Sequence, residues 1–165
     1  MMYVLYDIIH LFKNIRNNWI TEKLQTLIFF DIDTNEEVIA RWKDLIDIYK
    51  SEETSDLKQT RLNYKTLHPN NFEKQKVHLV SNVFNEKTIV ALEERGMRGT
   101  AYFVKNVTRM WNILNIRSNE IGYRLNDQDR KPFYDQSDRR LDFLLRMATV
   151  FKQMDNSVRG CRVKG

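Results

Sequence analysis

Apolar residues recur at the spacing of an α-helix along most of this sequence, and residues that interrupt helices are rare. The 165 residues include only five glycines and two prolines, which suits a body built from helices. Two short runs, Tyr3–Tyr6 and Thr26–Phe30, are the only strong β-strand candidates. Two short strands alone do not make a stable sheet. The sequence therefore predicts a mainly α fold.

Capping residues and apolar stripes divide the chain into expected helices. Asp7 is typical of a helix N-cap, and Thr34 with Glu37 spells a capping box that predicts the start of another helix. Asn85 and Gly96 are expected to cap the two ends of a further helix. The expected helices cover residues 7–19, 34–49, 71–84, 86–95, 100–117 and 137–154, and the polar stretches 50–58 and 121–136 are expected loops. The last helix is expected to turn one apolar set inward: Leu141, Leu144, Leu145, Ala148 and Phe151.

The composition excludes several classes of protein. Apolar residues make up 42% and charged residues 30% of the chain, which is typical of a globular domain rather than a disordered one. The single cysteine, Cys161, excludes an internal disulfide and a multi-cysteine zinc site, and it fits a reducing compartment. No apolar run approaches the roughly 20 residues of a membrane helix, and the N-terminus does not resemble a signal peptide.

Charge is distributed unevenly along the chain, whose net charge is +5. Residues 31–56 hold nine acidic and three basic residues, residues 57–76 hold one acidic and five basic, and residues 94–165 hold eight acidic and fifteen basic. Basic stretches of this kind indicate either an anionic partner, such as nucleic acid or a nucleotide, or a solvated surface of mixed charge.

A lysine interrupts the apolar side of the helix expected over residues 71–84. At about 100° per residue, Lys76 falls at about 40° from Phe72, between Val83 and Val80. A lysine on a buried face must reach solvent along its stem, pair with an acid or meet an anion. The periodicity leaves two interpretations of Lys76, a solvent-reaching lysine and a phosphate or nucleotide ligand.

Polar residues line one flank of the helix expected over residues 100–117. Thr108, Asn112 and Asn115 are spaced i, i+4 and i+7 beside the apolar stripe. Asparagine is a poor helix former, and its amide donates and accepts hydrogen bonds as a base edge requires. The same amides equally suit a bond to the backbone of a loop.

Catalytic motifs are not found in the sequence. It has no phosphate-binding glycine loop. Asp7 and His10 are spaced to share one helical turn, but two ligands do not make a metal site. Cys161 has basic neighbours but no base that would make it a nucleophile.

Three stretches together resemble the P-element-type transposases, a group that includes the THAP-domain transposase family. Residues 7–17 resemble the family signature Asp-x-Pro-His-Leu-x-Lys-x-x-Arg-Asn, with Ile9 in place of the usual proline. Residues 68–77 resemble the stretch that opens a helix of the family's GTP-binding insertion domain. Residues 100–103 with 110–115 resemble the helix that carries its guanine-contacting side chains. The order and spacing of the three stretches agree with the family.

The resemblance implies an RNase H-like catalytic core interrupted by a helical GTP-binding insertion. Residues 1–20 then end the first core segment as a strand–helix remnant, and residues 21–165 belong to the insertion, which continues beyond this chain. The catalytic carboxylates, which hold magnesium in the full-length enzyme, are expected outside this chain. GTP is the implied cofactor, transposon-end DNA the implied partner of the full-length protein and the nucleus the implied location. The resemblance leaves open whether the protein forms homo-oligomers, and it implies no membrane partner.

The resemblance carries four nucleotide contacts over to this sequence. Lys76 stands where the family has a GTP-contacting lysine, and Arg61 falls near another basic contact. Asn115 matches an asparagine near the guanine, and Asn112 stands where an aspartate is expected. An amide has only one acceptor, whereas a carboxylate accepts from both the N1–H and the N2 amino group of guanine. The sequence therefore leaves an alternative, a domesticated or degenerate non-enzymatic relic that binds DNA or protein through a basic helical surface.

Overall fold

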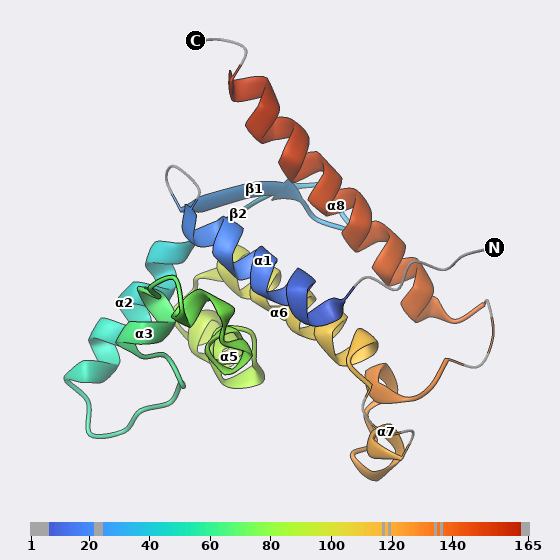
Figure 1. The fold of residues 1–165 in the computed structure, drawn as a ribbon, viewed down its shortest axis with the longest axis horizontal. Helices are drawn as coiled ribbons and strands as arrows, with labels where there is room; N and C mark the ends of the chain where they lie inside the picture. Colours follow the sequence, from blue (N-terminus) through green and yellow to red (C-terminus); the bar gives the residue numbers. More distant parts are fainter. Residues whose placement is uncertain are drawn as a thin grey trace. The chain divides into compact units, whose positions relative to one another are not determined.

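The computed structural model describes residues 7–21, 25–116, 118, 120–133, 135 and 137–162, with side chains as far as Met154. The described chain is mainly helical with one two-stranded sheet (Figure 1), which confirms the predicted mainly α fold. The elements are α1 (Ile8–Thr21), β1 (Thr26–Phe30), β2 (Glu37–Arg41), α2 (Trp42–Glu53), α3 (Tyr64–Leu67), the 3₁₀ turn η1 (Glu73–Gln75), α4 (Val77–Ser81), α5 (Glu86–Glu94), α6 (Arg98–Leu114), α7 (Ile121–Arg124), the 3₁₀ turn η2 (Gln128–Arg130) and α8 (Arg139–Arg162).

The chain forms two compact units. The first unit contains α1 and residues 40–111, and the second unit contains residues 27–39 and the chain from Asn112 onward. This division follows packing within the chain. The boundary expected between residues 20 and 21 stays a prediction.

Helix α1 begins as its sequence predicts. The Asp7 carboxylate accepts a hydrogen bond of 2.9 Å from the backbone N–H of Ile9, which satisfies one of the free donors of the first turn. The helix buries Phe12, Ile15 and Trp19. The strand expected at Tyr3–Tyr6 lies outside the described residues.

A hairpin replaces the helix expected from Thr34. Strand β1 covers the predicted run Thr26–Phe30, and β2 pairs with it. The Asp31 carboxylate accepts from the backbone N–H groups of Asp33 and Thr34 at 2.7 and 2.8 Å, and Asn35 takes a left-handed backbone conformation at φ 57°. Because of these turn contacts, the chain reverses direction at the segment that was predicted to cap a helix. The helix begins only at Trp42, after β2.

The continuous helix expected over residues 71–84 is also wrong. The chain forms η1 and then α4, with Lys76 between them in an extended conformation at φ −83° and ψ 113°. A continuous helix needs the carbonyls of Glu73 and Lys74 as acceptors for the N–H groups four residues later. The Glu73 carbonyl accepts from the N–H of Lys76, three residues later, at 3.1 Å. The Lys74 carbonyl accepts from the Arg16 side chain of α1 at 3.0 Å, and the turn ends at Gln75.

Two further helices match their predictions closely. In α5, Asn85 accepts from the N–H of Thr88 at the N-terminus, and Gly96 follows the last turn at φ 72°. A left-handed residue after the last turn is the geometry that favours glycine. Helix α6 covers Arg98–Leu114, close to the expected 100–117.

Aromatic side chains connect the helices of the first unit, where α1 and α6 lie side by side (Figure 1). Phe12 stacks on Trp111 with ring centroids 4.1 Å apart. Trp19 meets Trp42 and Phe103 edge-on at 5.0 and 4.9 Å. Pairs with this geometry add stabilisation beyond the area that they bury.

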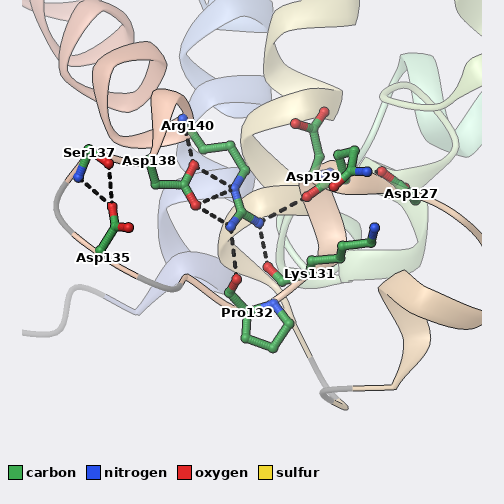
Figure 2. A network of polar contacts seen from close by, with 9 residues as sticks. Asp127, Asp129, Lys131, Pro132, Asp135, Ser137, Asp138 and Arg140 are labelled. Atoms are coloured by element: carbon green, nitrogen blue, oxygen red, sulfur yellow. Dashed lines mark hydrogen bonds and ion pairs between the residues drawn. The ribbon is translucent and has the colours of Figure 1, made fainter.

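A buried arginine organises the second unit (Figure 2). The Arg140 guanidinium donates to the carbonyls of Gln128, Lys131 and Pro132 and pairs with Asp138. Residues 121–136, which were expected to form a loop, contain two short elements, α7 and η2.

The inward face predicted for the last helix is right only in part. Of the predicted set, Leu141, Leu144 and Phe151 are half-buried, whereas Ala148 and Leu145 are exposed, Leu145 at 69%. Helix α8 buries Arg140, Phe143, Met147 and Val150. These buried positions share one face at helical spacing with Arg140. The contacts of Arg140 with residues 128–132 therefore fix which face of α8 turns inward.

Candidate functional site

Lys76, the first residue that the sequence singles out, lies at the junction between η1 and α4 and is exposed. Phe72, which the periodicity predicts to lie on a buried face together with Lys76, is 85% exposed. The interpretation of Lys76 as a lysine on a buried helical face is therefore wrong. Within the described part of the chain, its ammonium has no hydrogen-bond or ion-pair partner, so it stays available to an anion.

Arg61 lies in the connection between α2 and α3 and is exposed. Its side chain has no partner among the described residues. Arg61 and Lys76 belong to the same compact unit, but no described interaction joins them.

The two asparagines belong to the second unit. Asn112 lies on the last turn of α6, and its amide oxygen accepts a hydrogen bond of 3.1 Å from the Arg130 guanidinium. The Nε of Arg130 also lies 3.0 Å from the Asp127 carboxylate. Asn115 follows the end of α6. The single acceptor of Asn112 is thus bound within the protein.

Two other cations of the first unit, Lys13 and Arg16, form a cluster of buried basic side chains. Both are buried on α1, at 9% and 0% exposed, and both contact the η1 segment. The Lys13 ammonium lies 3.4 Å from the side-chain oxygen of Gln75, and Asn17 donates to the Lys74 carbonyl at 3.4 Å.

Arg16 is held without a carboxylate among the described residues. Its Nε donates to the Asn17 amide oxygen at 2.9 Å, and one Nη donates to the carbonyls of Glu73 and Lys74. The other, Nη1, is buried and has no partner in the described structure. Burial lowers the pKa of the Arg16 guanidinium to about 10 from its ordinary value of 12.5, because the apolar surroundings disfavour the charged form.

The sequence contained a signal for Arg16. At about 100° per residue, Arg16 falls at about 40° from Phe12, between Phe12 and Ile20, which falls at about 80°. This is the argument that selected Lys76. Helical periodicity correctly predicts the burial of Arg16 because α1 is a continuous helix. It fails for Lys76 because the helix expected there is interrupted.

Metal ligands are not clustered in the part of the chain that the structure describes, where no group of three or more His, Cys, Asp or Glu side chains is placed to hold a metal ion. No helix in the same described part is long and apolar enough to cross a membrane. Comparison with protein-family models, curated proteins and solved structures finds no match to this chain.

Proposed function

We propose that this chain is part of a P-element-like DNA transposase and corresponds mainly to its GTP-binding insertion domain. In this proposal residues 1–20 derive from an RNase H-like catalytic core, and GTP helps to position DNA for transposition in the nucleus. Magnesium and strand transfer belong to carboxylates of the full-length enzyme outside this chain.

The observation that supports this proposal is that all three family-like stretches meet in one core. Arg16 of the first stretch donates to the Lys74 carbonyl of the second at 3.0 Å. Phe12 of the first stretch stacks on Trp111 of the third at 4.1 Å. Residues that were selected only for their order along the chain are thus packed together, as parts of one functional unit are.

Two exposed cations are the proposed phosphate contacts. Lys76 and Arg61 are exposed in the first unit and have no acidic partner among the described residues. Such side chains are free to bind a triphosphate. Asn112 and Asn115 belong to the second unit and are proposed separately as contacts to a base, and the bond from Arg130 leaves the Asn112 amide oxygen one further lone pair.

Isothermal titration of GTP into the purified chain tests the nucleotide site. We expect saturable binding, weakened about tenfold by Lys76→Ala, which corresponds to about 1.4 kcal/mol. Lys87→Ala is the matched control, because Lys87 is also an exposed lysine, on α5 of the same unit. Equal affinities of the two variants for GTP would show that Lys76 is not a ligand.

The bond between Asn112 and Arg130 supports the second candidate, a non-enzymatic relic that binds DNA or protein through basic residues. While the Asn112 amide oxygen is bonded to Arg130, it keeps at most one lone pair for guanine, which weakens guanine recognition through this residue. Phosphate-driven DNA binding then remains, and its affinity falls steeply as the salt concentration rises. Fluorescence anisotropy with duplex DNA over a salt series measures that slope.

A further inference from the structure

Two neighbouring cations of α1 are buried without any described counter-charge. Arg16 is 0% exposed and Lys13 is 9% exposed, and they are three residues apart on the same side of the helix. Buried charges in proteins are normally paired with an opposite charge. The partners described for these two are all neutral: the carbonyls of Glu73 and Lys74 and the amide oxygens of Asn17 and Gln75.

The one acid of η1, Glu73, uses its carboxylate in another contact. The Glu73 carboxylate accepts from the backbone N–H of Asn70 at 2.9 Å, and the Asn70 side chain accepts from the N–H of Glu73 at 2.9 Å. This reciprocal cap fixes Glu73 at the start of η1. Lys74 and Lys76 follow on the same segment and add two positive charges.

Gln75 is the one side chain described in contact with the Lys13 ammonium. It is exposed, and its contact with the Lys13 ammonium is long for a hydrogen bond, at 3.4 Å. Rotation of this one surface side chain would free the Lys13 ammonium of its described partner without changing α1. The Arg16 Nη1, which has no partner in the described structure, supplies a further donor.

We infer that Lys13 and Arg16 form a binding site for a phosphate-type oxyanion, entered past Gln75. A guanidinium fork beside an ammonium matches the several oxygens of phosphate better than it matches a monatomic ion. The bound anion supplies the charge that the neutral carbonyls do not. The phosphate comes either free from solution or as a phosphate group of a nucleotide. The site needs no guanine, so it stands or falls separately from the proposed GTP function.

Thermal unfolding of the chain in inorganic phosphate, with ionic strength held constant by sodium chloride, tests the site. We expect Tm to rise by about 3–6 °C when phosphate is about tenfold above its dissociation constant. Lys13→Met, which keeps the length of the side chain and removes the charge, should abolish this rise. Lys87→Met on α5 should keep it. No rise in the unaltered chain, or an equal rise in Lys13→Met, would overturn the inference.

A second variant decides the matter if Lys13→Met fails to fold. Gln75→Glu places a carboxylate beside the Lys13 ammonium at an exposed position. This built-in oxyanion should raise Tm without phosphate and reduce the phosphate-induced rise at least by half. An undiminished rise in Gln75→Glu would place phosphate elsewhere on the chain.

Titrations with GTP and ATP separate this site from the proposed function. Equal stabilisation by both nucleotides that is lost in Lys13→Met and kept in Lys76→Ala supports the oxyanion site and contradicts the GTP site. Stabilisation by GTP that is lost in Lys76→Ala and unchanged in Lys13→Met supports the GTP site and contradicts the oxyanion site.

Discussion

At the scale of single residues, the pair formed by Asp138 and Arg140 links the stability of the second unit to pH (Figure 2). The hydrogen bond from Arg140 lowers the pKa of Asp138 to about 2 from its ordinary value of 3.8. A carboxyl group with a lowered pKa in the folded state stabilises that state above its ordinary pKa. This stabilisation is lost as the pH falls from 3.8 through about 2.

Replacement of Asp138 by asparagine should therefore have a pH-dependent effect. At pH 6 we expect Asp138→Asn to have a lower Tm than the unaltered chain, because Arg140 loses its charged partner. The difference in Tm should shrink as the pH falls from about 4 to about 2. Thermal unfolding over this range measures it, with Asp56→Asn, an exposed carboxylate without a described partner, as the control. A difference that is constant down to pH 2 would contradict the assigned pKa.

The sequence identified residues of interest better than it identified their surroundings. Asp7 and Asn85 were predictable as caps, because capping depends on neighbours two or three residues away. The exposure of Lys76 was not predictable, because it depends on contacts from Arg16, 58 residues from Lys74 along the chain. The bond from Arg130 to Asn112 likewise joins positions 18 residues apart. Periodicity does not report such contacts.

At the scale of elements, short segments depend on contacts outside themselves. The capping box at Thr34 lies in a hairpin turn, where the Asp31 carboxylate accepts two backbone hydrogen bonds and Asn35 takes a left-handed conformation. The reciprocal cap of Asn70 and Glu73 begins only a single 3₁₀ turn. Helices α1, α5 and α6 agree closely with their predicted bounds, since each buries an apolar face along its length.

The short helix α7 also depends on a contact outside itself, because the backbone at the end of η2 packs against Gly122. A Cβ added at Gly122 would lie 2.6 Å from the carbonyl carbon of Arg130 and 2.6 Å from the nitrogen of Lys131. These are backbone atoms, so they move only if the whole segment moves.

The change Gly122→Ala should therefore destabilise the protein, although alanine is the better helix former. We expect a loss of about 1–3 kcal/mol in the free energy of unfolding, the usual cost of overpacking. Urea unfolding measures this loss. Arg124→Ala, an exposed change on the same short helix, should be nearly neutral. A Gly122→Ala variant as stable as the original would mean that α7 and η2 do not pack this closely.

At the scale of the whole molecule, the central claim rests on three stretches of sequence that converge on the first unit. Phe12 and Arg16 on α1 contact the other two stretches through Trp111 and Lys74. The mainly helical body was predictable from composition and periodicity. The division into two compact units was not, because the hairpin residues 27–39 group with the chain after Asn112, a contact pattern that local sequence does not encode.

The ratio of the dissociation constants for ATP and GTP, measured by calorimetry on the purified chain at fixed ionic strength, tests the central claim most directly. A GTP-binding insertion domain predicts tighter binding of GTP than of ATP, with the preference carried by the base and the affinity dependent on Lys76. Equal affinities for GTP and ATP, or no binding of either, would contradict the proposed function.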